Sequence, residues 1–285
     1  MPPDLITLFL DSWYTIGKLH LFCEDYVCLG EQPFPYLILA DGCSAAPDSD
    51  LGARLLALNA RRLLPRFALG AVSEAERTAR HWRLGRRMIR RAARQARDLG
   101  LDEGVLDATL LIAWCEGDAV HVHLYGDGCI ITRSVAGAVA AIQVEYAENA
   151  PYYLSYLLDA ERGALYREAI GDPPTGQSVH YLHDGGATLR QEPFDAPTVF
   201  SFNLTTFPTV AVATDGLHSF MNMDTGERVE LLEVAQQLLD FPNFDTGFVK
   251  RRTHEVLAEY GRKRVVNLDD LGWGAFVRVG ARSRA

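Results

Sequence analysis

Several hallmarks of other protein classes are missing from this sequence of 285 residues. Its longest apolar runs, such as TLLIAWC at 109–115, fall far short of the roughly 20 residues that span a membrane. The first residues include Asp4 and Asp11 and no basic stretch, so we expect no signal peptide. The five cysteines form no C-x-x-C pair, which argues against a zinc ribbon or a disulfide framework. We therefore expect a cytoplasmic protein in a reducing environment, without a membrane partner.

The composition is that of a globular chain, with 48% hydrophobic and 23% charged residues. Its length allows one large domain or two ordinary ones. No internal repeat or low-complexity linker divides it. We therefore expect residues 1–285 to form a single domain.

The charge is unevenly distributed. The net charge is −9, yet residues 73–97 contain nine Arg and two Glu, a local charge of +7 that leaves −16 for the remainder. On a helical wheel the arginines occupy one half and apolar residues the other, and Ser73 with Glu76 forms a capping box. This pattern predicts one long amphipathic helix lying on a core. A basic stripe could attract nucleic acid or phosphorylated partners, but the acidic remainder would repel nucleic acid. We interpret the stripe as a solvated outer face without a catalytic role, and we expect no nucleic-acid partner.

The sequence contains many strand-like patterns and few helical ones. We expect strands at about 19–29, 35–41, 108–115, 118–125, 129–133, 138–146, 198–203, 209–214 and 274–279. Helical patterns occupy roughly 49–69, 73–99, 229–240 and 246–260. Paired strands with two consecutive helices after the second one favour α+β layers over βαβ repeats. The stretch 147–197 is rich in turn residues and aromatics, which predicts an irregular excursion, either a mobile lid or a short helix packed on the sheets.

Two apolar stretches far apart in the chain end in the same dipeptide. YLILADG at 36–42 and VAVATDG at 210–216 both stop at Asp-Gly. A hairpin turn would need a second strand directly afterwards, and neither site supplies one. Other acids also adjoin apolar strands: Glu24, Asp25, Asp127, Asp269 and Asp270.

Carboxylates at the ends of buried strands stay ionised only if cations compensate them. Few Lys or Arg lie near these acids in the sequence. Divalent cations bound through oxygen ligands would compensate them, and such ligands favour Mg²⁺ or Mn²⁺ over Zn²⁺. Gly42 would let a backbone carbonyl approach an ion closely.

The order of motifs CED, ILADG, DATLLIA, YGDGCII, VATDG and LDD resembles that of the metal-dependent Ser/Thr protein phosphatases of type 2C, the PPM family. The match covers about 20–133 and 198–279. The resemblance implies an α-β-β-α sandwich of two antiparallel sheets flanked by helices. It places the inserted helix pair at about 49–99 in the first helical layer and the excursion at about 147–197 at the variable flap.

The resemblance also implies roles for the acids. Asp41 would bridge two Mn²⁺ or Mg²⁺ ions, and the Gly42 carbonyl would bind one of them. Asp215 and Asp269 would hold the other ion. Glu24 and Asp25 would act through metal-bound waters, and Asp127 matches a residue that serves a third ion in some members. The implied reaction is attack of a metal-bridging hydroxide on the phosphorus of a phosphoserine or phosphothreonine protein substrate.

Four positions depart from the family pattern. His20 stands where the family has an arginine for the substrate phosphate. Cys43 replaces a histidine that would protonate the leaving alcohol. Ser219 occupies the position of a second ligand to the third ion, and Asp270 replaces an asparagine. We include His20 and Cys43 with Asp25, Asp41 and Asp215 as candidate catalytic positions.

Two other functions stay open. A binding or regulatory module that keeps the fold with little activity is favoured by the replaced substrate-handling groups. A doubly wound phosphotransfer domain with Asp41 as nucleophile is disfavoured, because βα alternation and a phosphate-binding glycine loop are missing. His121 and His123 alternate on one strand and are interpreted as part of a hydrogen-bonded strand face.

Overall fold

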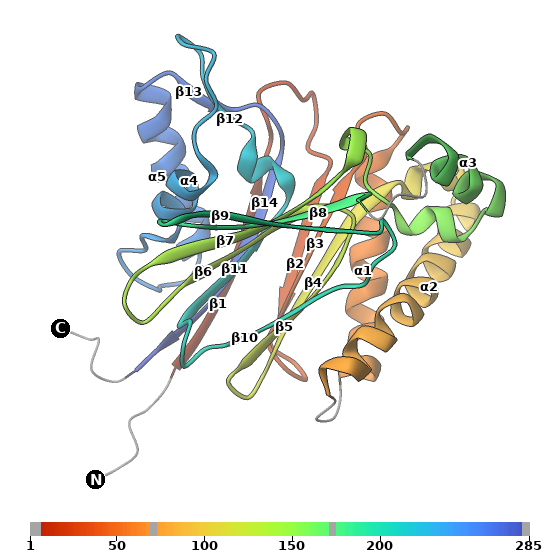
Figure 1. The fold of residues 1–285 in the computed structure, drawn as a ribbon, viewed down its shortest axis with the longest axis horizontal. Coiled ribbons are helices and arrows are strands. Elements are labelled where there is room, and N and C mark those ends of the chain that lie inside the picture. The colour runs from red at the N-terminus through yellow and green to blue at the C-terminus, as the bar shows by residue number, and fades with distance from the viewer. Residues whose placement is uncertain (1–6, 69–72, 171–174, 281–285) are drawn as a thin grey trace.

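Two antiparallel sheets packed face to face form the centre of the molecule, and helices cover both outer faces (Figure 1). The computed structural model describes residues 7–68, 73–170 and 175–280, so Asp4 lies outside the described residues. The α-β-β-α sandwich expected from the sequence is confirmed. Within the described ranges no helix is long and apolar enough to cross a membrane. All five cysteines are free thiols.

The two sheets have complex strand orders. The seven-stranded sheet runs β1 (Thr7–Thr15), β14 (Leu271–Val279), β11 (Thr209–Ala213), β6 (Gly128–Arg133), β7 (Val139–Tyr146), β8 (Gln177–His183), β9 (Gly186–Glu192). The five-stranded sheet runs β10 (Thr198–Asn203), β5 (Ala119–Tyr125), β4 (Ala108–Glu116), β3 (Tyr36–Gly42), β2 (Asp25–Gly30). A small pair is formed by β12 (Phe220–Asn222) and β13 (Val265–Asn267).

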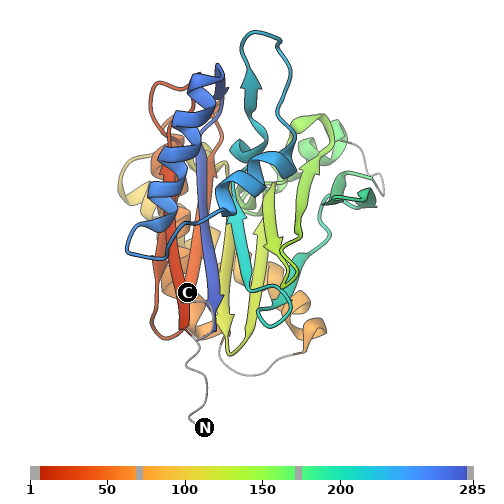
Figure 2. The same cartoon turned by 90° about the vertical axis from the view of Figure 1, so that its left-hand side faces the viewer.

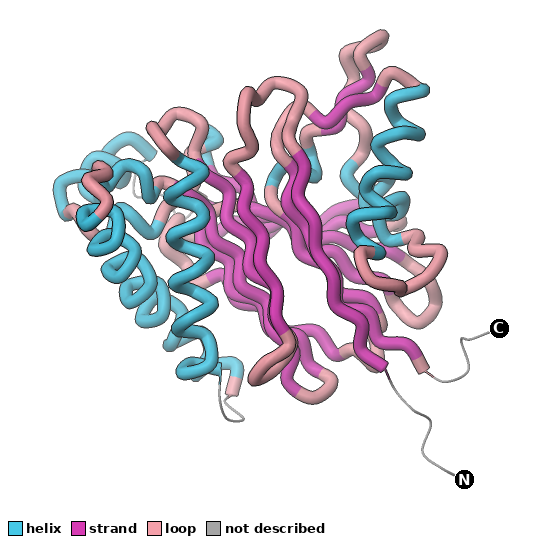
Figure 3. Tube along the Cα trace, turned by 180° about the vertical axis from the view of Figure 1, so that it is seen from behind, coloured by secondary structure: helices cyan, strands magenta, loops and turns pink. Residues whose placement is uncertain are grey.

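Helices form the outer layers. α1 (Ser49–Ala68) and α2 (Glu74–Asp98) cover the five-stranded sheet, and α4 (Leu231–Leu239) and α5 (Phe248–Arg262) cover the seven-stranded sheet (Figure 2). Seen from behind, the two helical layers lie on opposite sides of the strands (Figure 3). The remaining helical segments are η1 (Glu103–Leu106), η2 (Ala147–Asn149), η3 (Leu154–Leu157), α3 (Ala160–Ile170) and η4 (Asp215–His218).

β3 shows why the central strands are apolar on both faces. Side chains alternate across a strand, and here Leu37 and Leu39 pack between the two sheets, whereas Ile38 and Ala40 pack against the α1–α2 layer. Neither face meets water, so the strand is a continuous apolar run. It turns polar only at Asp41, where the sandwich ends.

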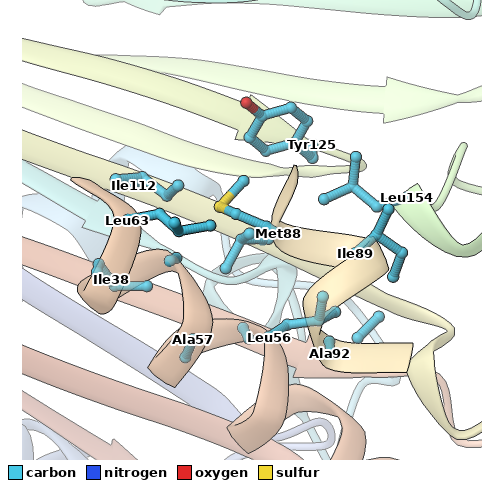
Figure 4. Close-up of a cluster of buried hydrophobic side chains, with 14 of the residues drawn as sticks. Ile38, Leu56, Ala57, Leu63, Met88, Ile89, Ala92, Ile112, Tyr125 and Leu154 are labelled. Atoms are coloured by element: carbon cyan, nitrogen blue, oxygen red, sulfur yellow. The ribbon is translucent and has the colours of Figure 1, made fainter. Parts of the chain in front are cut away.

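α2 is amphipathic, as its sequence predicts. Ser73 and Glu76 form the capping box at its N-terminus. Met88, Ile89 and Ala92 are buried against α1 and the sheet (Figure 4), and truncating a buried side chain the size of Met88 to alanine typically costs about 2–5 kcal/mol. A Cβ on Gly85 would lie 2.9 Å from the Tyr125 ring, so only glycine permits this close approach of helix and sheet.

Several elements differ from those expected. Residues 7–15 form β1, a half-buried strand whose polar interruptions hide its pattern, and the strand expected at 19–29 begins only at Asp25. The residues 16–24 instead form the loop that carries His20. The excursion at 147–197 is largely ordered, because α3 and the hairpin β8–β9 lie within it, although residues 171–174 fall outside the described part. Its aromatic start is a short 3-10 helix, η3, in which Leu154 is buried.

Candidate metal centre

Strand ends from both sheets converge at one edge of the sandwich. Asp25 on β2 lies opposite Asp41 on β3 in the five-stranded sheet. Asp215 follows β11 of the seven-stranded sheet and opens η4, and a hydrogen bond from the Asp41 carboxyl reaches it. The two Asp-Gly motifs, 174 positions apart in the sequence, therefore meet across the sandwich.

The carboxyl groups at this edge raise one another's pKa values. Burial, followed by the charges of neighbouring aspartates, raises the pKa values of Asp25 and Asp41 well above their usual range. Burial and the Asp215 charge do the same to the pKa of Asp127. Burial and Asp269 raise the pKa of Asp215 from 3.8 to about 6. These carboxylates cannot all be ionised near neutral pH unless cations lie among them.

Asp25 supplies an independent sign of a bound cation. The Thr214 hydroxyl, positioned by the Gly272 N–H at 3.0 Å, donates to Asp25 Oδ2 at 2.8 Å. The other oxygen, Asp25 Oδ1, is buried and has no hydrogen-bond partner among the described residues. A buried carboxylate oxygen without a donor is costly, and a water in the shell of an oxygen-binding divalent ion would satisfy it. The residues present therefore fit Mg²⁺ or Mn²⁺.

Gly42 and Glu24 lie beside this cluster. The Gly42 N–H donates to the Glu24 carbonyl at 3.3 Å. A Cβ on Gly42 would lie 2.6 Å from the Ser49 carbonyl oxygen, so glycine is needed where β3 passes the start of α1. The Ser49 hydroxyl donates to the Glu24 carboxylate, which is buried. Both residues that the sequence assigned to the site therefore lie beside the carboxylate cluster, and their contacts to an ion remain a prediction.

His20 lies among three carboxylates. Its Nδ1 lies 3.3 Å from Glu24 Oε2 and 3.2 Å from Asp270 Oδ2, and its Nε2 lies 3.1 Å from Asp269 Oδ1. One potential ligand atom from each of His20, Glu24 and Asp270 falls within 4.8 Å of the others. His20 is thus engaged with the acids of the protein rather than turned freely toward a substrate.

Asp270 ties two distant segments together. Its Oδ1 accepts the Gly17 N–H at 2.7 Å, and its Oδ2 accepts the Glu24 N–H at 2.6 Å. Both oxygens are therefore used in holding the 16–24 loop against β14. The aspartate that replaces the family asparagine has a structural task here.

A cavity of about 260 Å³ opens beside the cluster. Its acidic lining residues are Asp127, Glu145, Asp215 and Asp269, and its basic ones are His20, His218 and Arg228. Arg228 Nη1 donates to the His218 carbonyl at 2.9 Å, which fixes the arginine at the rim. The sequence analysis missed Arg228 and Glu145, because neither adjoins a recognisable motif.

The other two positions that depart from the family pattern, Ser219 and Cys43, also make contacts within the protein. The Ser219 hydroxyl donates to the Gly216 carbonyl at 2.8 Å. Cys43 lies beside Tyr153, near the start of the 147–197 excursion, and the pKa of Tyr153 is raised chiefly by burial and then by Cys43. The Cys43 N–H donates to the Asp107 carbonyl at 2.8 Å.

Asp107 connects the metal-centre loop to the excursion. Its Oδ1 accepts the Ser155 hydroxyl at 2.5 Å, and its Oδ2 accepts an N–H of Arg162 at 2.7 Å. One residue thus holds Cys43 through its backbone and η3 and α3 through its side chain. Sequence reasoning gave no indication of this junction.

Known proteins that resemble this chain include phosphatases. A family model described as "Protein phosphatase 2C" matches residues 18–246. The solved serine/threonine phosphatase Stp1 from Staphylococcus aureus is 13% identical, with 97% of each chain covered and a TM-score of 0.53. PppA, a regulatory component of T6SS in Pseudomonas aeruginosa, is 15% identical over 95% of this chain and 98% of that one, with a TM-score of 0.53.

A third solved structure is the catalytic domain of the serine threonine protein phosphatase PstP in complex with two manganese ions. It is 15% identical, covers 96% of this chain and 100% of its own, and has a TM-score of 0.50. At these identities the likeness shows the fold. No curated protein matches the chain.

Proposed function

Because the chain belongs to the protein phosphatase 2C family, we propose that it hydrolyses phosphoserine and phosphothreonine in proteins with two Mn²⁺ or Mg²⁺ ions. The observation that carries this proposal is the convergence of carboxylates from both sheets around the unpartnered Asp25 Oδ1. We take residues 1–285 as one phosphatase domain with the 147–197 excursion as its flap.

Each acid would have a separate task. Asp41 would bind both ions, the Gly42 carbonyl would bind one of them, and Asp215 and Asp269 would bind the other. Glu24 and Asp25 would orient waters in the ion shells, and Thr214 holds Asp25 for that task. Asp127 would serve a further, weaker site. When bound, the ions supply an activated water as nucleophile and neutralise the phosphoryl oxygens.

Arg228 is the residue that we assign to the substrate phosphate. Of the three basic residues lining the cavity, His20 contacts three carboxylates. Burial and then the Arg228 charge lower the pKa of His218, so this imidazole is neutral near pH 7. The Arg228 guanidinium offers a fork of N–H donors suited to phosphate. It would take the task of the arginine that His20 replaces.

The departures limit the chemistry of the leaving group. A well-placed general acid typically contributes about 10²–10⁴-fold, and Cys43, which lies beside Tyr153, replaces the histidine that would provide it. Activated esters need little protonation of the leaving group. We therefore propose measurable turnover of p-nitrophenyl phosphate and slow turnover of phosphothreonine peptides.

Phosphate release from a phosphothreonine peptide, measured with Mn²⁺ and with EDTA, tests the proposal. Asp41→Asn should abolish the Mn²⁺-dependent release while the protein stays folded. Asp184→Asn, at an exposed turn far from the site in the sequence, is the matched control. Asp107→Asn is unsuitable as a control because of its contacts with Ser155 and Arg162.

The measurement also separates the alternatives. Unchanged hydrolysis by the Asp41 variant would refute the binuclear centre. Calorimetric Mn²⁺ binding without turnover of either substrate would favour a binding module with a phosphatase fold. The contacts of His20 with three carboxylates are the observation that keeps this second function open.

A further inference from the structure

The outer face of α2 carries a continuous row of arginines. Its members are all exposed: Arg83, Arg86, Arg87, Arg90, Arg94 and Arg97. These six residues form the arginine stripe. At 1.5 Å per residue the stripe is about 21 Å long. Residues 73–97 contain no lysine, so every positive charge of this surface is a planar guanidinium.

The protein itself neutralises little of this charge. Among the described residues, the ion pair of the stripe is that of Arg97 with Glu103, at 3.8 Å. Arg87 lies 5.2 Å from the ring centre of Phe67, a contact that leaves its charge intact. Like charges four residues apart, such as Arg86 and Arg90, destabilise a helix. The stripe is thus electrostatically unfavourable in the isolated protein.

A cleft lies at the C-terminal end of the stripe. It has a volume of about 420 Å³, with Arg90, Arg94 and Arg97 on the helix side and Leu157 and Leu158 on the η3 side. Glu103 also lines the cleft, where it pairs with Arg97. The two leucines face the three guanidinium groups across the cleft. This combination suits a peptide that carries acidic residues together with an apolar residue. A solvated outer face, as the sequence suggests, would not need this concave surface.

We propose that the arginine stripe and this cleft bind an acidic segment of a partner protein. Guanidinium forks pair with carboxylates in two-bonded geometry. The remainder of the molecule carries −16, which repels extended polyanions such as duplex DNA and broad anionic membranes. A short acidic segment can lie along one helix without meeting that repulsion. This surface is separate from the cavity beside the metal centre, so the proposal is independent of the phosphatase activity.

Fluorescence anisotropy of a labelled ten-residue oligoglutamate peptide with the full chain tests the proposal. We expect saturable binding that weakens as salt is raised, because exposed charge pairs are screened. Arg90→Glu with Arg94→Glu should weaken binding about tenfold or more. The milder pair Arg90→Gln with Arg94→Gln should weaken it about threefold and guards against misfolding of the first variant.

The control is a matched charge reversal elsewhere. Arg262→Glu with Lys263→Glu changes the net charge equally on exposed residues at the end of α5. Parental affinity in this control supports the stripe. Equal weakening in both double variants, no binding of oligoglutamate, or tighter binding of a DNA duplex or of phosphatidylserine vesicles would each overturn the proposal.

Discussion

Replacing Asp215 with asparagine should stabilise the metal-free protein and remove its stabilisation by Mn²⁺. The pKa of Asp215 rises from 3.8 to about 6 on folding, through burial and then the Asp269 charge. At about 1.36 kcal/mol per unit, ionising this group in the folded state costs about 3 kcal/mol. The side chain is partly shielded rather than exposed, so solvent screening reduces this figure only modestly.

The sign follows from which state binds the proton. Between pH 3.8 and about 6 the folded protein keeps the Asp215 proton that the unfolded chain has lost, so stability falls as pH rises through this window. Above pH 6 the full penalty remains. Asp215→Asn should therefore raise the free energy of unfolding at pH 8 by up to about 3 kcal/mol and change little near pH 4.

Thermal unfolding in EDTA at pH 8 and pH 4 measures the effect. With an unfolding entropy of about 2.1 cal/mol/K per residue, a gain of 3 kcal/mol raises Tm by about 5 °C in a chain of this size. Added Mn²⁺ should then raise the Tm of the parent and of the control Asp184→Asn, but hardly that of the Asp215 variant. A variant that is less stable than the parent in EDTA at pH 8 would refute the reasoning.

Four further outcomes are expected. Burial lowers the pKa of His123 to about 3, so the unfolded chain binds a proton that the folded one does not, and stability should fall by about 2 kcal/mol between pH 6.5 and 5. The variant His123→Asn should lose less stability over this pH range, as measured by urea unfolding. Arg228→Gln should raise KM for a phosphothreonine peptide about tenfold or more at unchanged Tm, and Arg228→Lys should recover part of it; an unchanged KM would remove the arginine from the site. Asp107→Asn should speed proteolysis within residues 147–170, since two donors lose their charged acceptor, and unchanged cleavage would contradict the junction. Cys43→His should raise turnover of the peptide more than that of p-nitrophenyl phosphate, and equal gains would dismiss the general-acid explanation.

The sandwich and the acidic edge where its strands end could be predicted, because both depend on local sequence patterns. β3 and β11 are apolar runs, each followed by or ending in Asp-Gly, and in this sandwich they end at the same edge. Residues 73–97 show a helical period and a capping box, both of which depend only on neighbours three or four positions away.

The elements and site residues that the sequence did not predict depend on contacts between residues far apart in the chain. β1 is half-buried throughout, so its residues show no clear alternation. The strand β9 is mostly exposed and pairs through its backbone, which any side chain permits. Arg228 reaches the cavity from a loop beyond β12, and His20 meets Asp269 across 249 positions. No local pattern encodes such distances.

The two backbone hydrogen bonds accepted by Asp270 have a consequence for the timing of synthesis. They hold Gly17 and Glu24 with a side chain that leaves the ribosome about 250 residues later. β1 likewise stays without its neighbour until β14 emerges. A nascent chain from which β2 to β11 have emerged therefore contains most of the acidic residues of the candidate metal centre. It still lacks Asp270, whose hydrogen bonds hold the 16–24 loop in place. Ribosome-stalled chains ending before residue 269 should show no Mn²⁺-dependent protection from protease, whereas chains that carry residues up to 285 and an added C-terminal linker, so that β14 has left the ribosome, should be protected.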